Sequence, residues 1–389
     1  MRRVLTLATL YPNPHRPRFG AFVARQMEAL AARGEWDVTV INPIGVPPVA
    51  FGRYRTLAAA ARDGWEAGVT VHRPRFSLIP ALGGALNPAL MARAVLPLAR
   101  RLHAARPFDL VDAQFFYPDG PAAVRIARAL GLPLSIKARG ADIQLWGRKG
   151  FARRQMLAAA EEAAGLLAVS DALAGDMAAL GMARDRITVH HTGLDHSLFR
   201  PLDRRESRAR LPFALPSGAP LLATVGALIP RKGQLLVLRA LAQLHEAHVA
   251  LAGEGPDRAS LEAFARGAGL AERVHFVGLL DHRELPVLLS AADAMVLPSA
   301  SEGLANAWVE ALACGCPLVI AEAGGAREVV TSAAAGRIVA REPGAIADAV
   351  AELLAAPPAR EVVAACAQRF SWDANAAALA EYYAGLIAD

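Results

Sequence analysis

The sequence predicts an α/β protein built from two doubly wound parallel sheets. Residues 4–169 alternate short apolar runs with longer Ala-rich amphipathic runs, a pattern typical of repeated β-α units. A second series of the same kind begins at Leu221. Between the two series, residues 199–220 are rich in Pro and Arg, as a connection between domains often is. The 389 residues are enough for two domains of ordinary size.

In the first half, short apolar runs are assigned to strands, and the longer runs are assigned to helices. Gly34 and Gly131 end two of the helical runs, because glycine readily adopts the left-handed conformation that closes a helix. We predict strands at Val4–Leu10, Val38–Ile41, Val69–His72, Leu110–Ala113, Leu134–Lys137 and Gly165–Val169. We predict helices at Ala21–Arg33, Pro88–Ala104, Ala122–Leu130 and Arg153–Ala163.

The second half repeats the alternation and ends in one long helix. The final helix begins near Trp372, after a break at Ser371, and runs to Ala388. The predicted strands are Leu221–Val225, His248–Ala252, Val274–Val277, Ala294–Leu297 and Leu318–Ile320.

Composition narrows the class of protein. A hydrophobic content of 54% argues against disorder, and no run of 18 or more uncharged apolar residues suggests a membrane span. Met1-Arg2-Arg3 superficially resembles the start of a secretion signal. The apolar run behind it is short and lacks a small-residue cleavage site, so a first strand is favoured. Cys314 and Cys316 are predicted to be small buried residues rather than disulfide partners, which fits a reducing cytoplasm.

Charge is distributed unevenly along the chain. Residues 1–200 hold 26 Lys and Arg against 15 Asp and Glu, a net charge of +11, whereas residues 201–389 carry −5. This basic half favours an anionic acceptor or an anionic membrane surface. Arg alternates with apolar residues in 53–62 and 73–82, so peripheral membrane contact and a plain solvated surface remain alternatives. No nucleic-acid motif accompanies the charge, so nucleic acid is not an expected partner.

The stretch from 294 to 317 is the most informative in the chain. An apolar strand ends at Pro298, a short loop holds Glu302, and a helical pattern begins near Gly303. Glu310 follows eight residues later, about two turns on and about 80° round a helix axis. Both carboxylates can therefore face one cleft at the carboxyl end of a sheet. The backbone N–H groups of Gly303 and Leu304 suit an anion such as a phosphate.

This Glu-x7-Glu pattern, followed by Ala-x-Gly-x-Pro-Leu-Val, resembles the donor-site signature of the retaining family-4 glycosyltransferases. Nearly the whole chain shares the resemblance, and enzymes of teichuronic-acid and exopolysaccharide synthesis are a similar subgroup. The other matching motifs are Tyr11-Pro12-Asn13 to Val23, Val169-Ser170, Thr192–Asp195, Val225–Gly233, Leu251–Pro256 and Val274–Gly278.

The resemblance implies a GT-B architecture, in which two Rossmann-like domains face each other across a cleft. Residues 1–198 would form the acceptor-binding domain and residues 199–371 the donor-binding domain, with the helix 372–389 crossing back onto the first. The implied activity is that of a retaining hexosyltransferase. It would move sugar from a nucleotide-diphosphate sugar, with a UDP-sugar expected, to a glycan or lipid-linked glycan in cell-surface polysaccharide synthesis. A GDP-mannose-dependent mannosyltransferase and a non-catalytic nucleotide-sugar-binding partner are the alternatives.

On the donor side, Lys232 is the predicted charge-stabilising residue. The chain has 3 Lys against 39 Arg, so a Lys on a loop after a strand suggests a specific point charge for the leaving phosphate. Many relatives carry Arg where this chain has Ala227, and the neighbouring Arg231 could partly compensate. Glu310 is expected to bind ribose and Glu302 the donor sugar. The other predicted donor-site residues are Gly20, Gly253, Gly255, Val277, Gly303, Leu304 and Asn306.

On the acceptor side, Arg139 and Asp142 lie where relatives often show His-Gly-x-Asp. Arg139 would put a cation near the phosphate or the acceptor, and Asp142 would orient it or the acceptor hydroxyl. Without a His there, no general base is obvious, which suits a retaining reaction in which the leaving phosphate takes the acceptor proton. No Asp-x-Asp or His-x-x-x-His spacing predicts a metal, and no cofactor is expected. The expected location is the cytoplasm, with the inner face of the plasma membrane as a further option.

Overall fold

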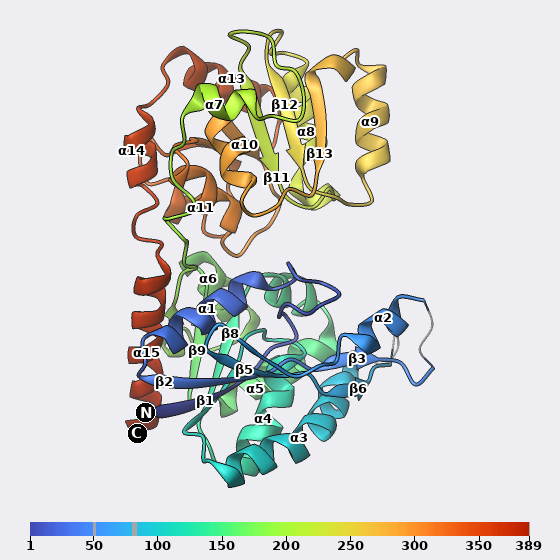
Figure 1. Ribbon diagram of the computed structural model, residues 1–389, viewed down its shortest axis with the longest axis vertical. Helices are drawn as coiled ribbons and strands as arrows, with labels where there is room; N and C mark the ends of the chain where they lie inside the picture. Colours follow the sequence, from blue (N-terminus) through green and yellow to red (C-terminus); the bar gives the residue numbers. More distant parts are fainter. Residues whose placement is uncertain (50–51, 80–83, 389) are drawn as a thin grey trace. The chain divides into compact units, whose positions relative to one another are not determined.

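The computed structural model describes residues 1–49, 52–79 and 84–388. The chain divides into two units, one formed by Met1–Gly193 with Trp372–Asp389 and the other by Leu194–Ser371 (Figure 1). The first boundary falls five residues before the predicted position 198. Residues 194–198 therefore belong to unit 2 together with Phe199, whose buried ring packs edge-on against His282 at 4.8 Å.

Unit 1 contains an eight-stranded sheet with the order β10-β9-β8-β7-β1-β2-β5-β4, in which only β4 is antiparallel to its neighbour. A separate parallel pair, β3 and β6, was not predicted. Both β3 and β6 are only three residues long, too short to show a period. The strands are β1 (Arg2–Leu7), β2 (Trp36–Ile41), β3 (Ile44–Val46), β4 (Gly64–Glu66), β5 (Val69–His72), β6 (Arg75–Ser77), β7 (Leu110–Ala113), β8 (Leu134–Ala138), β9 (Gly165–Ala168) and β10 (Ile187–Val189).

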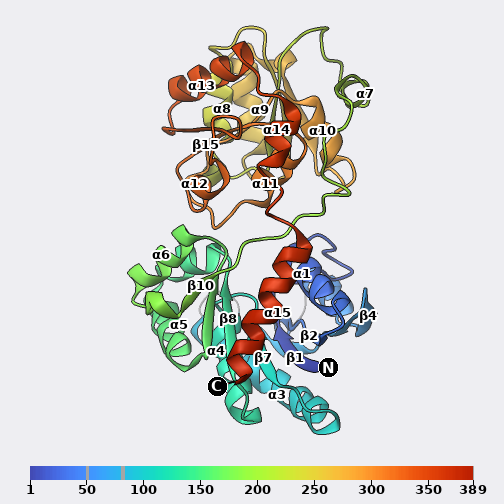
Figure 2. The ribbon, with the colours of Figure 1, turned by 90° about the vertical axis from the view of Figure 1, so that its left-hand side faces the viewer.

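Helices cover both faces of this sheet, as a doubly wound fold requires. One face is packed by α1 and by the C-terminal helix α15 (Figure 2). There Trp36 meets Tyr383 edge-on, with 5.4 Å between the ring centres. On the other face α4 packs between α3 and α5. The helices of unit 1 are α1 (Ala21–Ala32), α2 (Arg53–Ala59), α3 (Asn87–Ala105), α4 (Asp119–Leu130), α5 (Gly150–Glu162), α6 (Asp171–Leu180) and α15 (Trp372–Ala388), with a π-helix at Asp142–Trp146.

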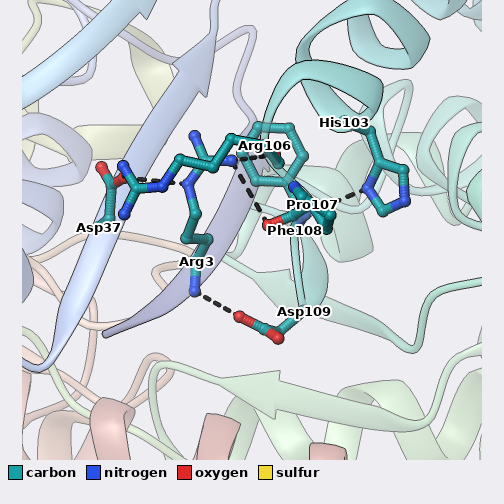
Figure 3. A network of polar contacts seen from close by, with 7 residues as sticks. All are labelled: Arg3, Asp37, His103, Arg106, Pro107, Phe108 and Asp109. Carbon is teal, nitrogen blue, oxygen red and sulfur yellow. Dashed lines mark hydrogen bonds and ion pairs between the residues drawn. The ribbon is translucent and has the colours of Figure 1, made fainter.

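A polar network closes the amino-terminal edge of this sheet (Figure 3). The Arg3 side chain donates to Asp37 at 2.9 Å and to the carbonyl of Arg106, while its backbone N–H donates to Asp109 at 2.6 Å. Arg106 also donates to Asp37 at 2.6 Å. The network therefore ties β1 to β2 and to the connection before β7, at the edge opposite the strands' carboxyl ends.

Unit 2 contains a six-stranded parallel sheet with the order β13-β12-β11-β14-β15-β16. The core on one face is formed with α8, α9 and α13. On the other side α10 packs against α7 and α11, and α11 packs against α14. The strands are β11 (Leu221–Val225), β12 (His248–Ala252), β13 (Val274–Gly278), β14 (Ala294–Leu297), β15 (Leu318–Ala321) and β16 (Gly336–Val339).

The helices of unit 2 are α7 (Arg204–Ala209), α8 (Gln234–Leu241), α9 (Arg258–Gly267), α10 (Leu285–Ala291), α11 (Asn306–Ala313), α12 (Ala326–Val329), α13 (Pro343–Ala355) and α14 (Arg360–Ala365). Each unit thus has the predicted doubly wound α/β fold, which confirms the fold class. Cys314 and Cys316 are buried free thiols, as predicted. In the described part of the chain, no helix combines the length and the apolar character needed to cross a bilayer.

Candidate functional site

The sheet of unit 2 reverses its winding direction between β11 and β14. The chain leaves β11 for β12 on one side, whereas β14 lies on the other side of β11. Open α/β sheets bind their ligands at such a switch point, outside the carboxyl ends of the strands. The loop after β11 carries Lys232, and the loop after β14 carries Glu302. Two residues that lie 70 positions apart in the sequence are therefore brought to the two sides of the switch point.

Lys232 and Glu302 form an ion pair at this position. The Lys232 ammonium lies 2.5 Å from one carboxylate oxygen of Glu302, which is only 7% exposed. The Arg231 guanidinium lies 3.4 Å from the other oxygen and also donates to the carbonyl of Ser301. Two cations thus share one buried carboxylate, which leaves this group with a net positive charge. Such a group can attract a further anion. The side chains of Arg231 and Lys232 therefore converge on Glu302. Arg231 must lie beside Lys232 in this way if it is to compensate for Ala227.

Glycines let the loops after β11, β12, β14 and β15 pack backbone against backbone at this edge of the sheet. A Cβ atom at Gly253 would lie 1.9 Å from the carbonyl oxygen of Gly226, and one at Gly255 would lie 2.2 Å from that of Leu228. Between the loops after β14 and β15, a Cβ at Gly324 would lie 2.2 Å from the carbonyl oxygen of Glu302. Gly253 and Gly255 therefore hold the loops together, and this packing alone accounts for both glycines.

The helix after β14 begins later than predicted. Helix α11 starts at Asn306, so Gly303 and Leu304 belong to the buried loop before it. The predicted start of the helix near Gly303 is therefore wrong, and the angle of about 80° between Glu302 and Glu310 does not apply, because residues 303–305 are not helical. The helical pattern seemed to start early because Leu304 and Ala305 are apolar loop residues that are buried against the unit.

Glu310 lies on α11, in a partly buried position. Burial raises its pKa to about 7, and no hydrogen bond to another described residue offsets this effect. A carboxylate without partners can accept hydrogen bonds from two neighbouring hydroxyl groups. Near Glu302, the Ser299 hydroxyl is also buried without a partner among the described residues. Val277 lies near the end of β13. Two strands, β12 and β11, separate β13 from β14, the strand that leads to Glu302.

In unit 1, Arg139 follows β8 and is held by two buried amide side chains. Its guanidinium donates to the side-chain oxygens of Gln114 and of Gln26, the latter at 3.3 Å, and it lies over the ring of Phe22. Burial lowers the pKa of Arg139 to about 10. Among the described residues, this guanidinium donates to neutral partners and to no carboxylate, although the charges of Asp112 and Asp142 favour its charged form.

Lys137 belongs to the same buried network. Its ammonium contacts the Gln26 side chain at 3.0 Å and His190 Nδ1 at 2.5 Å. His190 Nε2 lies 2.9 Å from the carbonyl of Asn375, which can only accept, so Nε2 carries the hydrogen and Nδ1 accepts from Lys137. Burial lowers the pKa of Lys137 well below its ordinary value. Helix α15 is thereby tied to the carboxyl end of the sheet.

Asp142 is fully buried and occupied by backbone groups. Its two oxygens accept from the N–H groups of Phe116 at 2.8 Å, Arg139 at 3.0 Å, Gly140 at 2.8 Å and Ile143 at 3.1 Å. It therefore contacts Arg139 through the backbone and not through the guanidinium. This arrangement indicates that Asp142 shapes the loop, and it argues against a direct contact between Asp142 and the acceptor hydroxyl.

Replacing Asp142 with Ala is expected to lower the free energy of unfolding by about 1–3 kcal/mol, because buried N–H groups would lose their acceptor. Asp142→Asn, which keeps one acceptor oxygen, should lose less. Urea unfolding of the two variants checks the order. Equal stability of Asp142→Ala and the unchanged protein would show that the loop does not depend on this carboxylate.

Gly20 caps helix α1 at φ 71°. A Cβ there would lie 2.4 Å from the carbonyl carbon of Leu10, so only glycine lets the loop after β1 return this closely. Within that loop, Thr9 donates to Asp119 through both its backbone N–H at 2.8 Å and its hydroxyl at 2.7 Å. Burial raises the pKa of Asp119 to about 7. This contact lies at the switch point of unit 1, between β1 and β7.

The sequence reasoning missed Gln26 and the role of His190. Gln26 is fully buried on the face of α1 that also buries Val23, Met27 and Leu30. A polar residue at the core-facing period of an apolar helix is a signal that could have identified it, because buried amides need partners.

The predicted amphipathic segment 73–82 is only partly exposed. Pro80, Ala81 and Leu82 lie outside the described residues. Arg73 is 4% exposed and donates to Glu66 at 2.6 Å and to the carbonyl of Pro12 at 3.0 Å, and Phe76 is also buried. These two side chains are therefore not available on a membrane-facing surface.

Two family models match the chain. The model for Glycosyltransferase Family 4 matches residues 20–198, and the model for Glycosyl transferases group 1 matches residues 204–370. Among relatives, the D-inositol 3-phosphate glycosyltransferase of Mycobacterium leprae is 38% identical over 216 residues, which are 52% of this chain and 50% of the relative. That of Mycobacterium tuberculosis is 39% identical over 210 residues, 51% and 43% of the two chains. This chain spans about half the length of these relatives.

Solved structures share the fold over essentially the full length. Sucrose-phosphate synthase from Thermosynechococcus elongatus superposes with a TM-score of 0.81 at 21% identity and covers 100% of both chains. Anabaena HepE, solved in complex with UDP-glucose, has a TM-score of 0.75 at 20% identity and covers 99% of this chain and 100% of its own. Together with the two family models, the two Rossmann-like units show that the chain belongs to the family-4 glycosyltransferases of GT-B fold.

Proposed function

We propose that the protein transfers a hexose from a nucleotide-diphosphate sugar to a glycan or lipid-linked acceptor, with retention of the anomeric configuration. The observation that carries the proposal is the group of Lys232, Arg231 and Glu302 at the switch point of unit 2. Two cations at the carboxyl end of a parallel sheet suit a diphosphate. Family membership supports the class of reaction.

Departure of the nucleotide diphosphate places negative charge on the phosphate that leaves the sugar. Lys232 and Arg231 would stabilise that charge, which is the largest electrostatic demand of the reaction. As the diphosphate pairs with Lys232, Glu302 would turn from this cation to the hydroxyl groups of the sugar. Glu310 would accept hydrogen bonds from the ribose.

We propose retention because the charged residues predicted on the acceptor side are held by other groups of the protein. They are therefore not free to act as a general base or as a nucleophile. Asp142 is occupied by four backbone N–H groups, and Arg139 is held by Gln26 and Gln114. An inverting displacement needs a free general base, and a double displacement, which also retains the configuration, needs a free carboxylate next to the anomeric carbon. A reaction in which the leaving phosphate takes the acceptor proton needs none.

The proposed donor is a UDP-sugar, and the proposed role of the protein is in cell-surface polysaccharide synthesis. The structures of HepE with UDP and with UDP-glucose support this choice, since HepE has the same fold. The basic character of residues 1–200 supports an anionic acceptor and a site of action at the inner face of the plasma membrane. A GDP-mannose donor is the competing assignment.

Release of nucleotide diphosphate from UDP-, GDP- and ADP-sugars, with cell-envelope glycolipid fractions as acceptors, tests the proposal. UDP release together with a product of unchanged anomeric configuration, read by NMR, is the expected result. Preferential GDP release from GDP-mannose would overturn the donor assignment. A protein that binds these sugars but releases no nucleotide from any of them would instead be a non-catalytic partner.

The raised pKa of Glu310 leads to a pH dependence of donor binding. The ionised form accepts the ribose hydroxyl groups, so affinity should rise with pH and level off above about 7. At one pH unit below the pKa, about a tenth of the protein is ionised, so affinity should be about tenfold lower. UDP-glucose is the right probe, because its diphosphate lacks the terminal phosphate group that titrates near 6.

Glu310→Gln should bind UDP-glucose more weakly at pH 8 and show little change between pH 6 and pH 8. Isothermal titration calorimetry at several pH values measures both proteins. The unfolding stability of the free protein should change in the opposite direction. An acid with a raised folded pKa binds more protons when folded, so its contribution falls as pH rises from 4.5 to above 7. A pH-independent affinity in the unchanged protein would remove Glu310 from the ribose site.

A further inference from the structure

Unit 1 contains a cavity of about 320 Å³ at the carboxyl ends of β1 and β2. It lies between the loop that follows β1, the short β3–β6 pair and helix α3. This volume is at the lower end of the range found for small-molecule sites. The cavity therefore has room for one ring or a short chain, and not for an oligosaccharide.

The lining of this cavity is mainly apolar. Its apolar side chains come from several separate segments, including α2, α3 and the β3–β6 pair, so the cavity is formed by tertiary packing and not by one loop. Of the described residues that line it, Arg16 is the only charged one, and its guanidinium lies 5.7 Å from the centre of the Phe19 ring. The side chains that define it are Phe19, Ile44, Phe76, Leu78, Met91 and Trp146.

Most polar side chains of the lining are already satisfied within the protein. Thr9 donates to Asp119, Asn13 accepts from the backbone of His15 and Arg16, and the Tyr117 hydroxyl donates to the Gly84 carbonyl. Asn87 is likewise bonded to the backbone of Ile79. A sugar ring presents several hydroxyl groups and would find few free partners here.

Asn42 is the exception. Its amide nitrogen donates to the carbonyl of Ala8 at 2.7 Å, which fixes the side chain, and its oxygen is buried without a partner in the described part of the chain. Asn42 is 1% exposed and lines the cavity. A buried acceptor without a donor is costly, and a ligand hydroxyl can satisfy it.

We propose that this cavity binds a hydrocarbon segment attached to the acceptor, with Asn42 accepting one hydrogen bond from the same molecule. Identifying the ligand as the acceptor rests on the proposed function, whereas the apolar lining and the Asn42 oxygen do not depend on it. The acceptor is thereby assigned to the lipid-linked class, and the cavity takes the part of the lipid nearest to the sugar.

A series of n-alkyl β-D-glucosides from butyl to nonyl tests the proposal, with each compound kept below its critical micelle concentration. Binding is followed by calorimetry without any nucleotide present. Affinity should rise about fourfold for each added methylene group until the cavity is full, and then level off. Free glucose should not bind measurably. An affinity that ignores chain length, or that free glucose matches, would overturn the proposal.

Leu57→Trp fills the cavity from helix α2, where Leu57 lines it in a half-buried position. This variant should lower octyl glucoside affinity at least tenfold. Ala59→Trp is the matched control, because it adds the same side chain to an exposed position of the same helix outside the lining. Leu78→Asp, at another half-buried lining position, serves if Leu57→Trp fails to fold. Equal affinity of the filled variant and the control would contradict the assignment.

UDP-glucose binding to the same variants separates this proposal from the proposed function. Normal donor binding without any chain-length dependence would overturn the cavity assignment alone. Chain-length-dependent binding in a protein that binds no nucleotide sugar would confirm an apolar site and overturn the proposed function instead.

Discussion

Replacing Lys232 with Ala is expected to slow sugar transfer by about 10²–10³-fold, which corresponds to about 2.7–4 kcal/mol in the activation free energy. The reason is local. Lys232 is held 2.5 Å from Glu302 at the switch point of unit 2, where the leaving phosphate would gain its charge. Folding should change much less, because Glu302 keeps Arg231 at 3.4 Å as a partner.

Steady-state release of UDP and the melting temperature are measured on the same preparation of the variant. Arg266→Ala is the matched control, since it removes one positive charge from an exposed position on α9 of the same unit. The control should retain full turnover. Unchanged turnover in Lys232→Ala would end its assignment as the phosphate-stabilising residue.

Gly253→Ala is expected to lower the free energy of unfolding by about 4 kcal/mol and to abolish donor binding. Two costs add. The residue has φ +151°, which L-residues rarely adopt, and its Cβ would lie 1.9 Å from the carbonyl oxygen of Gly226. The Gly226 carbonyl cannot shift at little cost, because it belongs to the backbone of the neighbouring loop. The loops after β11 and β12 would be forced apart, and Lys232 lies on the first of these loops.

Gly267→Ala provides the opposite control in the same unit. Gly267 lies in helix α9, and a Cβ there would meet nothing within 4 Å. This change should stabilise the protein by about 0.4–1 kcal/mol, because it reduces the freedom of the unfolded chain. Urea unfolding compares the two variants. If Gly253→Ala proves as stable as Gly267→Ala, backbone packing does not hold the loops together.

Strands buried on both faces were predictable from the sequence, and short edge strands were not. The runs 110–113, 221–225, 248–252 and 294–297 have the predicted bounds, because each is a mainly apolar, buried run. The run 69–72 also has the predicted bounds, because its two valines alternate with Thr70 and His72 as in a half-buried strand. Strand β10 has only three residues, one of them exposed, and β4 has none buried, so neither shows the period of a buried strand.

The candidate site was only partly predictable for a related reason. Residue types and spacing identified Lys232 and Glu302, but the pairing itself depends on the order of β11 and β14, which local sequence does not specify. Asp142 showed the reverse problem. A carboxylate in a motif suggested chemistry, yet the fold turns four backbone N–H groups toward it. Gln26 was missed because one amide in an apolar helix gives no motif.

A thermal-shift screen against UDP, GDP, ADP and their common sugar conjugates, without added metal, tests whether unit 2 binds a nucleotide sugar. A ligand that binds only the folded protein at 100 times its Kd adds about 2.7 kcal/mol of stability, which raises the melting temperature measurably. We expect UDP and a UDP-sugar to stabilise the unchanged protein selectively, and Lys232→Ala and Glu310→Ala to weaken the effect. Melting temperatures that no nucleotide changes would contradict a donor site at the switch point of unit 2.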